Sequence, residues 1–191
     1  GIQSGSQRIL MDLFKRGTPP EKIKKTVQIL DEEGKDINRF YDIIVDNPFQ
    51  TEDEIVETVL FVNEFTRNFN LSIFPLLFYP GTEMTDQAKN CGFDTNQPKL
   101  LSGESCKYEP SYLNRLLRCL PYTPAKWITY WVKGRNKPGK RRLFYLYYFG
   151  YFTTFHKFLY NIRKVTVLWF SLHCIGPREQ KAKRIMRYIK L

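Results

Sequence analysis

Three stretches in the first half of the chain each combine a strand-forming run with a turn that leads into a helix pattern. They are residues 1–6, which are rich in glycine and serine, residues 41–54 and residues 71–83. A strand followed by a helix, repeated along the chain, is typical of a parallel sheet or barrel. In such folds the binding and catalytic groups lie on loops at the carboxyl ends of the strands. We therefore expect the functional residues in the turns that follow these strands.

Local signals define the expected elements more closely. Residues 40–45 and 71–78 are apolar runs rich in β-forming residues, which predicts buried parallel strands. Thr51 and Glu54 have the spacing of a capping box and predict the start of a helix. Further helices are expected at residues 6–16, 18–33, 82–92, 110–120, 124–133, 140–173 and 178–190, with a linker at 94–110 and a basic turn at 133–142. The expected fold class is α/β over residues 1–93, followed by an all-helical module at 111–191.

Charge is distributed unevenly along the chain. Residues 1–125 carry 14 Lys/Arg and 18 Asp/Glu, a net charge of −4, whereas residues 126–191 carry 16 Lys/Arg and one acid, a net charge of +15. Within the basic part, the segment Phe144–Phe170 alone holds 12 of the 30 aromatic residues of the chain. This asymmetry predicts that the helical module faces an anionic partner.

Three interpretations of the aromatic helix stay open. Its longest uncharged run, 143–156, has 14 residues, which is shorter than the roughly 18–20 residues that cross a bilayer. A basic, aromatic, amphipathic helix suits the surface of a membrane, and it equally suits packing against the α/β part. Nucleic acid is the weakest alternative, because tyrosines clustered in one helix do not form the sheet platform on which bases stack.

The four cysteines and two histidines give no metal or catalytic pattern. The gaps between successive cysteines are 15, 13 and 55 residues, too long for a zinc knuckle or an iron–sulfur ligand run. We expect reduced, mostly structural thiols in a cytoplasmic protein that can lie at the periphery of a membrane, and no signal peptide. His156 and His173 are expected to have packing or surface roles.

The three motifs in series resemble the second half of the radical S-adenosylmethionine barrel, in the branch whose members carry a cobalamin-binding domain. Gly1–Ser6 resembles the end of the fourth strand of that barrel, Asp46–Thr51 the turn after the fifth, and Leu71–Glu83 the sixth strand with its Pro-Gly exit. The resemblance covers residues 1–93. It implies a partial (β/α) barrel that consists of the last three β-α units.

The resemblance also implies a set of cofactor-binding residues. They are Gln3, Ser4, Asp46, Asn47, Pro75 and Leu76. Many relatives have Glu at the position of Gln3, near the ribose and methionine end of the cofactor, and the sixth strand meets the adenine ring through its backbone. The residues themselves leave a structural alternative open, in which Asp46 or Asn47 forms an Asx turn and Thr51 only caps a helix. No catalytic residue is assigned.

One signature of the family is not in this sequence: the Cys-x3-Cys-x2-Cys loop that holds its iron–sulfur cluster. We therefore expect a fragment, the carboxyl-terminal half of a longer enzyme, that has no metal ligands and is inactive alone. The S-adenosylmethionine, the iron–sulfur (4Fe-4S) cluster and any cobalamin would belong to the parent enzyme. By radical chemistry that enzyme would act on a small or lipid-like substrate.

The expected partners follow from these interpretations. They are the missing amino-terminal part of the same protein, a membrane surface, and further copies of the chain, which would associate through the unpaired strand edge before Gly1. The alternative function is a non-catalytic module that binds a membrane surface or nucleic acid through its basic amphipathic helix.

Overall fold

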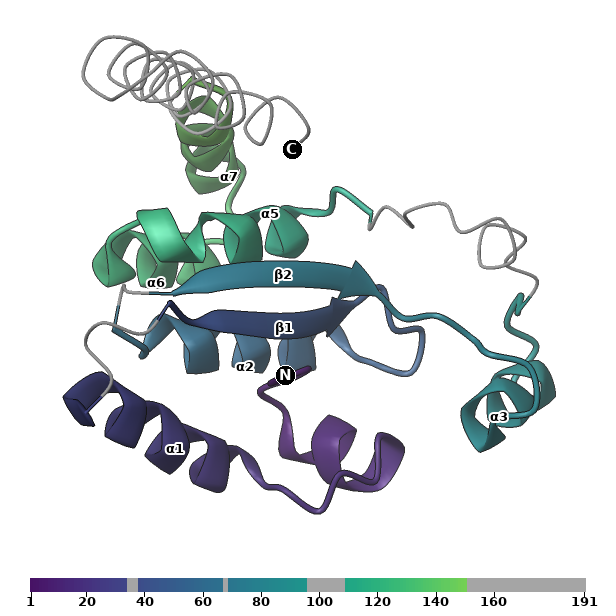
Figure 1. Cartoon of the computed structure of the whole chain (residues 1–191). Coiled ribbons are helices and arrows are strands. Elements are labelled where there is room, and N and C mark those ends of the chain that lie inside the picture. The colour runs from purple at the N-terminus through teal and green to yellow at the C-terminus, as the bar shows by residue number, and fades with distance from the viewer. Residues whose placement is uncertain (34–37, 67–68, 96–108, 151–191) are drawn as a thin grey trace, which may run out of the picture. The chain divides into compact units, whose positions relative to one another are not determined.

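The chain forms two compact units, Gly1–Lys137 and Pro138–Leu191. The fold comes from a computed structural model that describes residues 1–33, 38–66, 69–95 and 109–150 (Figure 1). The expected linker at 94–110 and the aromatic helix beyond residue 150 lie largely outside the described residues, as do Cys106, Cys174 and both histidines.

The first unit contains a short parallel sheet. Strands β1 (Phe40–Val45) and β2 (Asn70–Pro75) pair in parallel, with Phe40 opposite Asn70 and Val45 opposite Pro75. Near the amino terminus, Gln3 forms a parallel bridge with Ile43 through two backbone hydrogen bonds of 2.7 and 2.9 Å. Three stretches of chain therefore lie side by side in the order of the sequence.

Helices connect and flank these strands (Figure 1). The helical elements of the unit are η1 (Ile9–Leu13), α1 (Pro20–Glu33), α2 (Glu52–Asn63), α3 (Glu83–Asn90), α5 (Tyr112–Cys119), η2 (Leu120–Tyr122) and α6 (Ala125–Lys133). The capping box that the sequence predicts is present: the Thr51 hydroxyl accepts from the Glu54 N–H, and the Glu54 carboxylate accepts from the Thr51 N–H. Local side-chain chemistry therefore determines where α2 begins.

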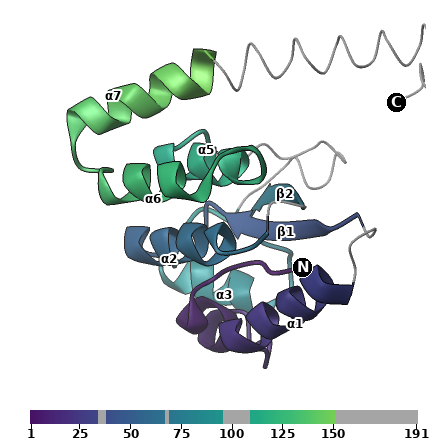
Figure 2. The same cartoon turned by 90° about the vertical axis from the view of Figure 1, so that its left-hand side faces the viewer.

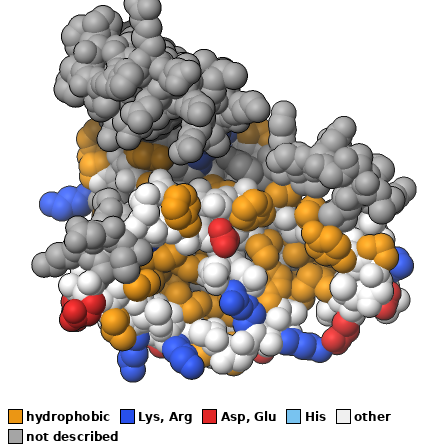
Figure 3. Space-filling model, viewed as in Figure 1, with side chains coloured by type: hydrophobic (Ala, Val, Ile, Leu, Met, Phe, Trp, Pro, Cys, Tyr) orange, Lys and Arg blue, Asp and Glu red, His pale blue; other side chains and the backbone are white. Residues whose placement is uncertain are grey.

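The two faces of the sheet have different surroundings. Helix α2 covers one face of the sheet (Figure 2). Tyr41, Ile43 and Val45 are buried on this side, and the Tyr41 ring lies 5.6 Å from that of Phe65, just after α2. On the other face, Phe40 and Phe74 are 63% and 51% exposed. No described helix covers that face, and hydrophobic side chains gather over the strands there (Figure 3).

Three boundaries differ from the expectations. Strand β2 ends at Pro75 rather than Phe78, because its partner β1 ends at the paired residue Val45, and the side chains of Leu76 and Phe78 pack instead in a cluster with Ala88 of α3. The first helix contains a π-helical turn, in which the Phe14 N–H donates to the Ile9 carbonyl. Helix α7 begins at Pro138, inside the expected turn at 133–142, because proline suits a first helical position.

The grouping of the helices also differs from the expected division at 94–110. Helices α5 and α6 belong to the same compact unit as the strands, and both contact α2. Asn63 of α2 donates hydrogen bonds of 3.2 Å to the Ala125 carbonyl and the Thr129 hydroxyl of α6. The described part of the chain is mixed α/β in class. Its sheet has two strands and one isolated bridge, so a partial barrel stays a prediction.

The described part of the second unit is α7 (Pro138–Tyr147) and the turn to Gly150. Phe144 and Tyr148 are buried, whereas Leu143, Leu146 and Phe149 are 50%, 67% and 52% exposed. Across the described ranges, no helix has the length and apolar character needed to cross a bilayer.

Candidate functional site

The residue at the first strand exit, Gln3, has an unusual backbone conformation. Its φ is 68°, and the N–H of Ser4 donates to the carbonyl of Ile2 at 2.9 Å, so that Gln3 is the central residue of a γ-turn. A non-glycine residue in such a conformation stores about 1–3 kcal/mol of strain, a feature that is enriched at binding sites. Within the described residues, the half-buried side-chain amide of Gln3 has no hydrogen-bond partner.

Asn47, after the end of β1, forms the Asx turn that the sequence offered as a structural alternative. Its Oδ1 accepts from the N–H of Phe49 at 3.0 Å, and its carbonyl accepts from the N–H of Gln50 at 3.0 Å. The side chain is 6% exposed, and its Nδ2 donor has no partner. Because a buried, unpaired amide donor costs about 1–3 kcal/mol, this group is a candidate for contact with a bound ligand.

Asp46 has both carboxylate oxygens occupied by the segment that begins α5. Oδ1 accepts from Asn114 Nδ2 at 2.8 Å, and Oδ2 accepts from the N–H of Glu109 at 2.6 Å. Asn114 is 2% exposed and also donates to the carbonyl of Glu109 at 2.8 Å. The Asp46 side chain thus joins the end of β1 to α5, 68 residues along the chain, which is a structural role that its sequence position does not indicate.

Ser4 is fully engaged inside the protein. Its hydroxyl lies 3.1 Å from the Thr58 hydroxyl and accepts from the N–H of Ser6 at 3.1 Å. Thr58 donates its single hydroxyl hydrogen to the Glu54 carbonyl, so Ser4 is the donor between the two hydroxyls. Ser4 is 1% exposed, and these bonds leave it no contact with a ligand.

Gly5 allows this loop to approach α2. A Cβ atom at this position would lie 2.7 Å from the Cβ of Phe61 and 2.8 Å from the Cα of Thr58. The Gly5 N–H also donates to the Thr58 hydroxyl at 3.0 Å. Only glycine therefore fits between the loop and the helix without displacing backbone atoms.

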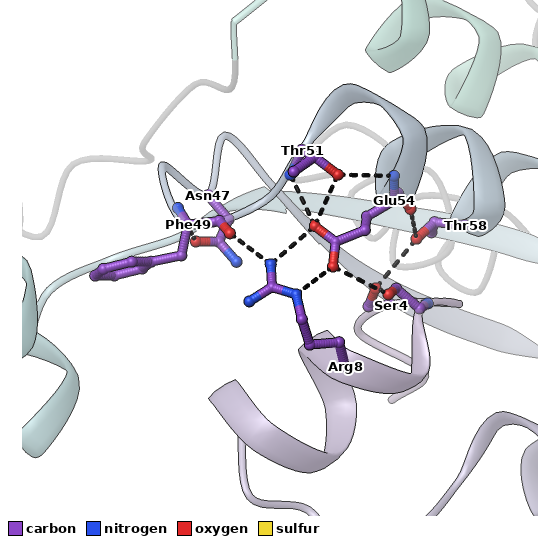
Figure 4. Close-up of polar contacts among 8 residues, drawn as sticks. Ser4, Arg8, Asn47, Phe49, Thr51, Glu54 and Thr58 are labelled. Atoms are coloured by element: carbon purple, nitrogen blue, oxygen red, sulfur yellow. Dashed lines mark hydrogen bonds and ion pairs between the residues drawn. The ribbon is translucent and has the colours of Figure 1, made fainter.

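An ion pair locks the two strand exits to each other (Figure 4). Arg8 Nε donates to Glu54 Oε1 at 2.6 Å, and Arg8 Nη2 donates to Glu54 Oε2 at 2.9 Å and to the Phe49 carbonyl at 2.7 Å. The Thr51 N–H and hydroxyl donate to the same Oε2 at 2.8 and 3.0 Å. The hydrogen bond from Arg8, helped by those from Thr51, lowers the pKa of Glu54 to about 2 despite its burial. Glu54 is therefore a charged anchor rather than a proton donor near neutral pH.

Pro75 and Leu76 occupy the exit of β2. Pro75 lies opposite Val45, and the Leu76 N–H donates to the Val45 carbonyl at 2.8 Å, which extends the ladder by one bond. The Leu76 side chain is buried with Phe78 and Ala88. Its side chain therefore serves the core, and only the backbone of this exit stays available to a ligand.

The structure thus sorts the six predicted residues into two groups. The side-chain amides of Gln3 and Asn47 each have at least one N–H without a hydrogen-bond partner among the described residues. The backbone of Pro75 lies in the same half of the sheet. Ser4, Asp46 and Leu76 are engaged in holding the fold. Gln3 pairs with Ile43, which precedes the end of β1 at Val45 by about 7 Å along the strand, at a rise of roughly 3.3 Å per residue. The exits of all three strands therefore lie in the carboxyl-terminal half of the sheet, and cofactor binding there stays a prediction.

The sequence analysis did not predict the residues that hold this site together from distant positions in the sequence. Arg8, Thr58 and Asn114 contact residues 46, 54 and 68 positions away. One signal existed for Arg8, because the capping box uses one oxygen of Glu54 and leaves the other in need of a donor. No local signal identifies Thr58 or Asn114.

A surface cleft of about 510 Å³ lies between the end of η1 and the start of α3. Lys15 and Glu83 form an ion pair of 2.6 Å at its edge, and both side chains are exposed. Asp12 and Asp86 also line it. The cleft offers polar surface, but its charged groups are exposed to solvent.

The two described cysteines differ in burial, and only Cys119 agrees with the expected structural role. Cys119 of α5 is fully buried, and this burial raises the pKa of its thiol to about 12, whereas Cys91 is exposed. In the described ranges, no group of three or more His, Cys, Asp or Glu side chains could hold a metal ion.

Comparison with known proteins finds no relative. No family model matches the chain, and neither a curated protein nor a solved structure matches it.

Proposed function

We propose that Gly1–Lys137 provides the S-adenosylmethionine-binding edge of a radical S-adenosylmethionine enzyme of the cobalamin-linked type. The observation that carries this proposal is that two side-chain amides with unpaired N–H donors lie at successive strand exits. Gln3 lies in a strained turn after the first stretch, and Asn47 has a buried, unpaired donor after β1. The parallel order of these stretches, with α2 packed on one face, supports the proposal, because consecutive β-α units of a barrel have the same order.

The residues present fit the cofactor in part. S-adenosylmethionine carries an amine, a carboxylate, ribose hydroxyls and an adenine ring, and both amide side chains can hydrogen-bond such groups. Gln3 offers a donor and an acceptor, while Asn47 offers its free Nδ2 donor. The backbone after Pro75 suits an adenine edge. Ser4, Asp46 and Leu76 have no part in this proposal, because their groups are already used.

The ion pair between Arg8 and Glu54 positions these groups. Arg8 reaches the Phe49 carbonyl, which belongs to the same turn as Asn47. Glu54 joins that turn to the start of α2 through Thr51. When bound beside a reduced iron–sulfur cluster, S-adenosylmethionine supplies the radical for hydrogen-atom abstraction. The chain's own contribution is to bind and orient, and the substrate class is a small or lipid-like molecule.

The proposal requires the cluster ligands, and any cobalamin site, on a separate stretch of protein. The uncovered sheet face with Phe40 and Phe74 is the surface that such a stretch would cover. In a barrel this face is the interior, which explains why large apolar side chains are found on it.

The coding sequence upstream of Gly1 provides the first test. We expect it to encode a Cys-x3-Cys-x2-Cys loop, and the longer protein, reconstituted without oxygen, to form 5′-deoxyadenosine from S-adenosylmethionine on reduction. The 191-residue chain alone should take up no stoichiometric iron and sulfide. An upstream frame without the loop, or a cluster-loaded protein that never cleaves S-adenosylmethionine, would overturn the proposal.

Point variants then test the edge itself. Asn47→Ala in the longer protein should weaken S-adenosylmethionine binding about tenfold, the loss of roughly one hydrogen bond, while the iron content stays the same. Asn136→Ala, an exposed asparagine between α6 and α7, is the matched control and should bind normally. Equal affinities for both variants would remove Asn47 from the site.

A second candidate function is a non-catalytic module that binds a membrane surface. One observation favours it: α7 exposes Leu143 and Leu146 and carries exposed Arg141 and Arg142, and Phe149, just after the helix, is also exposed. Leu146→Ser with Phe149→Ser should then abolish sedimentation of the chain with anionic vesicles. Unchanged sedimentation would exclude α7 as the contact.

A further inference from the structure

Helix α6 of the first unit presents an aromatic and basic outer face. Lys126 and Lys133 are exposed, and Trp127 and Tyr130 are 51% and 44% exposed. At 100° per residue, Lys126, Tyr130 and Lys133 fall within about 60° of the helix circumference, and Trp127 lies about 60° beyond Tyr130. Tyr122, just before the helix, is 46% exposed. Aromatic rings and lysine ammonium groups are therefore interleaved on one surface.

The opposite face of α6 is firmly packed. Ile128, Trp131 and Val132 are 0%, 3% and 2% exposed. After the helix, Arg135 donates to Glu52 at 3.0 Å and to Asp53 at 2.8 Å at the start of α2. Together with the hydrogen bonds from Asn63, these contacts fix the rotation of α6. The exposed aromatics thus belong to a rigid surface rather than to a loosely attached helix.

The charged residues in the chain segment that forms this surface are all basic. Residues 110–150 contain nine Lys/Arg and no Asp or Glu. Arg135, at the end of this surface, pairs with Glu52 and Asp53 of α2. A partner of this face must therefore be anionic, and it must also accept indole and phenol rings.

We propose that the outer face of α6 binds the surface of an anionic phospholipid bilayer. Trp and Tyr rings lie at headgroup level in membranes, where neighbouring lysines meet anionic lipid. A nucleic acid fits less well, because stacking needs open ring faces in a row, and Trp127 packs edge-on against Trp131 at 5.8 Å and 76°. This surface belongs to the first unit, and none of its residues is part of the proposed cofactor edge.

Vesicle binding by the full chain tests the proposal. The chain should sediment with vesicles of phosphatidylcholine and phosphatidylserine, far less with pure phosphatidylcholine, and less again as salt is raised. Lys126→Gln with Lys133→Gln should lower the affinity about 30-fold. Trp127→Ser with Tyr130→Ser should lower it at least about tenfold. All four positions are exposed, so the variants should keep the wild-type circular dichroism.

Two controls separate this surface from general charge and from the second unit. Lys22→Gln with Lys25→Gln removes two exposed lysines of α1 and should leave binding unchanged. In a Trp169→Phe background, lipids brominated near the headgroup should quench the fluorescence of Trp127, whereas Trp131 is buried. Absent quenching, or α6 variants that bind vesicles as the wild type does, would overturn the proposal. So would tighter binding to a single-stranded RNA that depends on the same residues, which would identify nucleic acid as the partner.

Discussion

On the α2 side of the sheet, Tyr41, Ile43 and Val45 are 8%, 0% and 4% exposed, whereas Phe40 and Phe74 on the other side are 63% and 51% exposed. Both sets come from the same two apolar runs, and the residues alternate along them. Parallel sheets are normally covered on both faces, so their strands are apolar throughout. The difference shows that the composition of a strand specifies how much apolar surface it offers, while the packing of helices decides which half is buried.

The largest expected effect is on the covered face. Ile43→Ala should lower the free energy of unfolding by about 2–5 kcal/mol, because the side chain is fully buried and its loss leaves a cavity. Urea denaturation followed by circular dichroism measures this change. Phe74→Ala, which removes a larger but half-exposed side chain, is the comparison and should cost far less. Equal losses would show that the uncovered face is packed in solution.

A smaller loss is expected where the loop after Gln3 meets α2 on the covered side. Gly5→Ala should cost about 1–3 kcal/mol, since the new methyl group would overlap Phe61 and the backbone of Thr58. Thermal unfolding compared with Gly139→Ala, where nothing lies within 4 Å of the added atom, gives a matched control. If both substitutions are neutral, the loop does not pack closely against α2.

The polar link between the same loop and α2 predicts a pH dependence. Because the pKa of Glu54 is about 2 when folded and lies higher when unfolded, its stabilising effect is complete above about pH 4.5 and is lost as the pH falls toward 2. Glu54→Gln keeps the capping geometry but removes the charge beside Arg8, and should cost about 1–2 kcal/mol at pH 7. Denaturation at pH 7, 4 and 3 should show a flatter profile for this variant. A parallel profile would mean that the ion pair does not form.

The smallest expected change in stability is on the uncovered face. Phe40→Ser with Phe74→Ser should alter the free energy of unfolding by no more than about 0.5 kcal/mol each, because both rings are exposed. The same substitutions should reduce self-association, since they remove exposed apolar surface. Light scattering over a concentration series measures this. Association that persists unchanged would locate the contact elsewhere, for example at a strand edge.

Several features follow from the sequence because their interactions are local. The limits of β1, the capping box of Thr51 and Glu54, and the Asx turn of Asn47 each involve residues at most a few positions apart. The N-caps Thr82 and Ser111 act in the same way. Over so few residues the backbone itself keeps donor and acceptor close together, so the residue types and their spacing are sufficient to predict these features.

Tertiary structure decided the rest of the site. Asp46 looks like a ligand residue in the sequence, yet it binds Asn114, and Ser4 is engaged by Thr58. Glu54 becomes a charged anchor and the Asn47 amide keeps an unpaired N–H because of groups that come close only in the folded protein. The same holds for the uncovered sheet face and the outer face of α6, because burial depends on what packs above a residue and not on the residue itself.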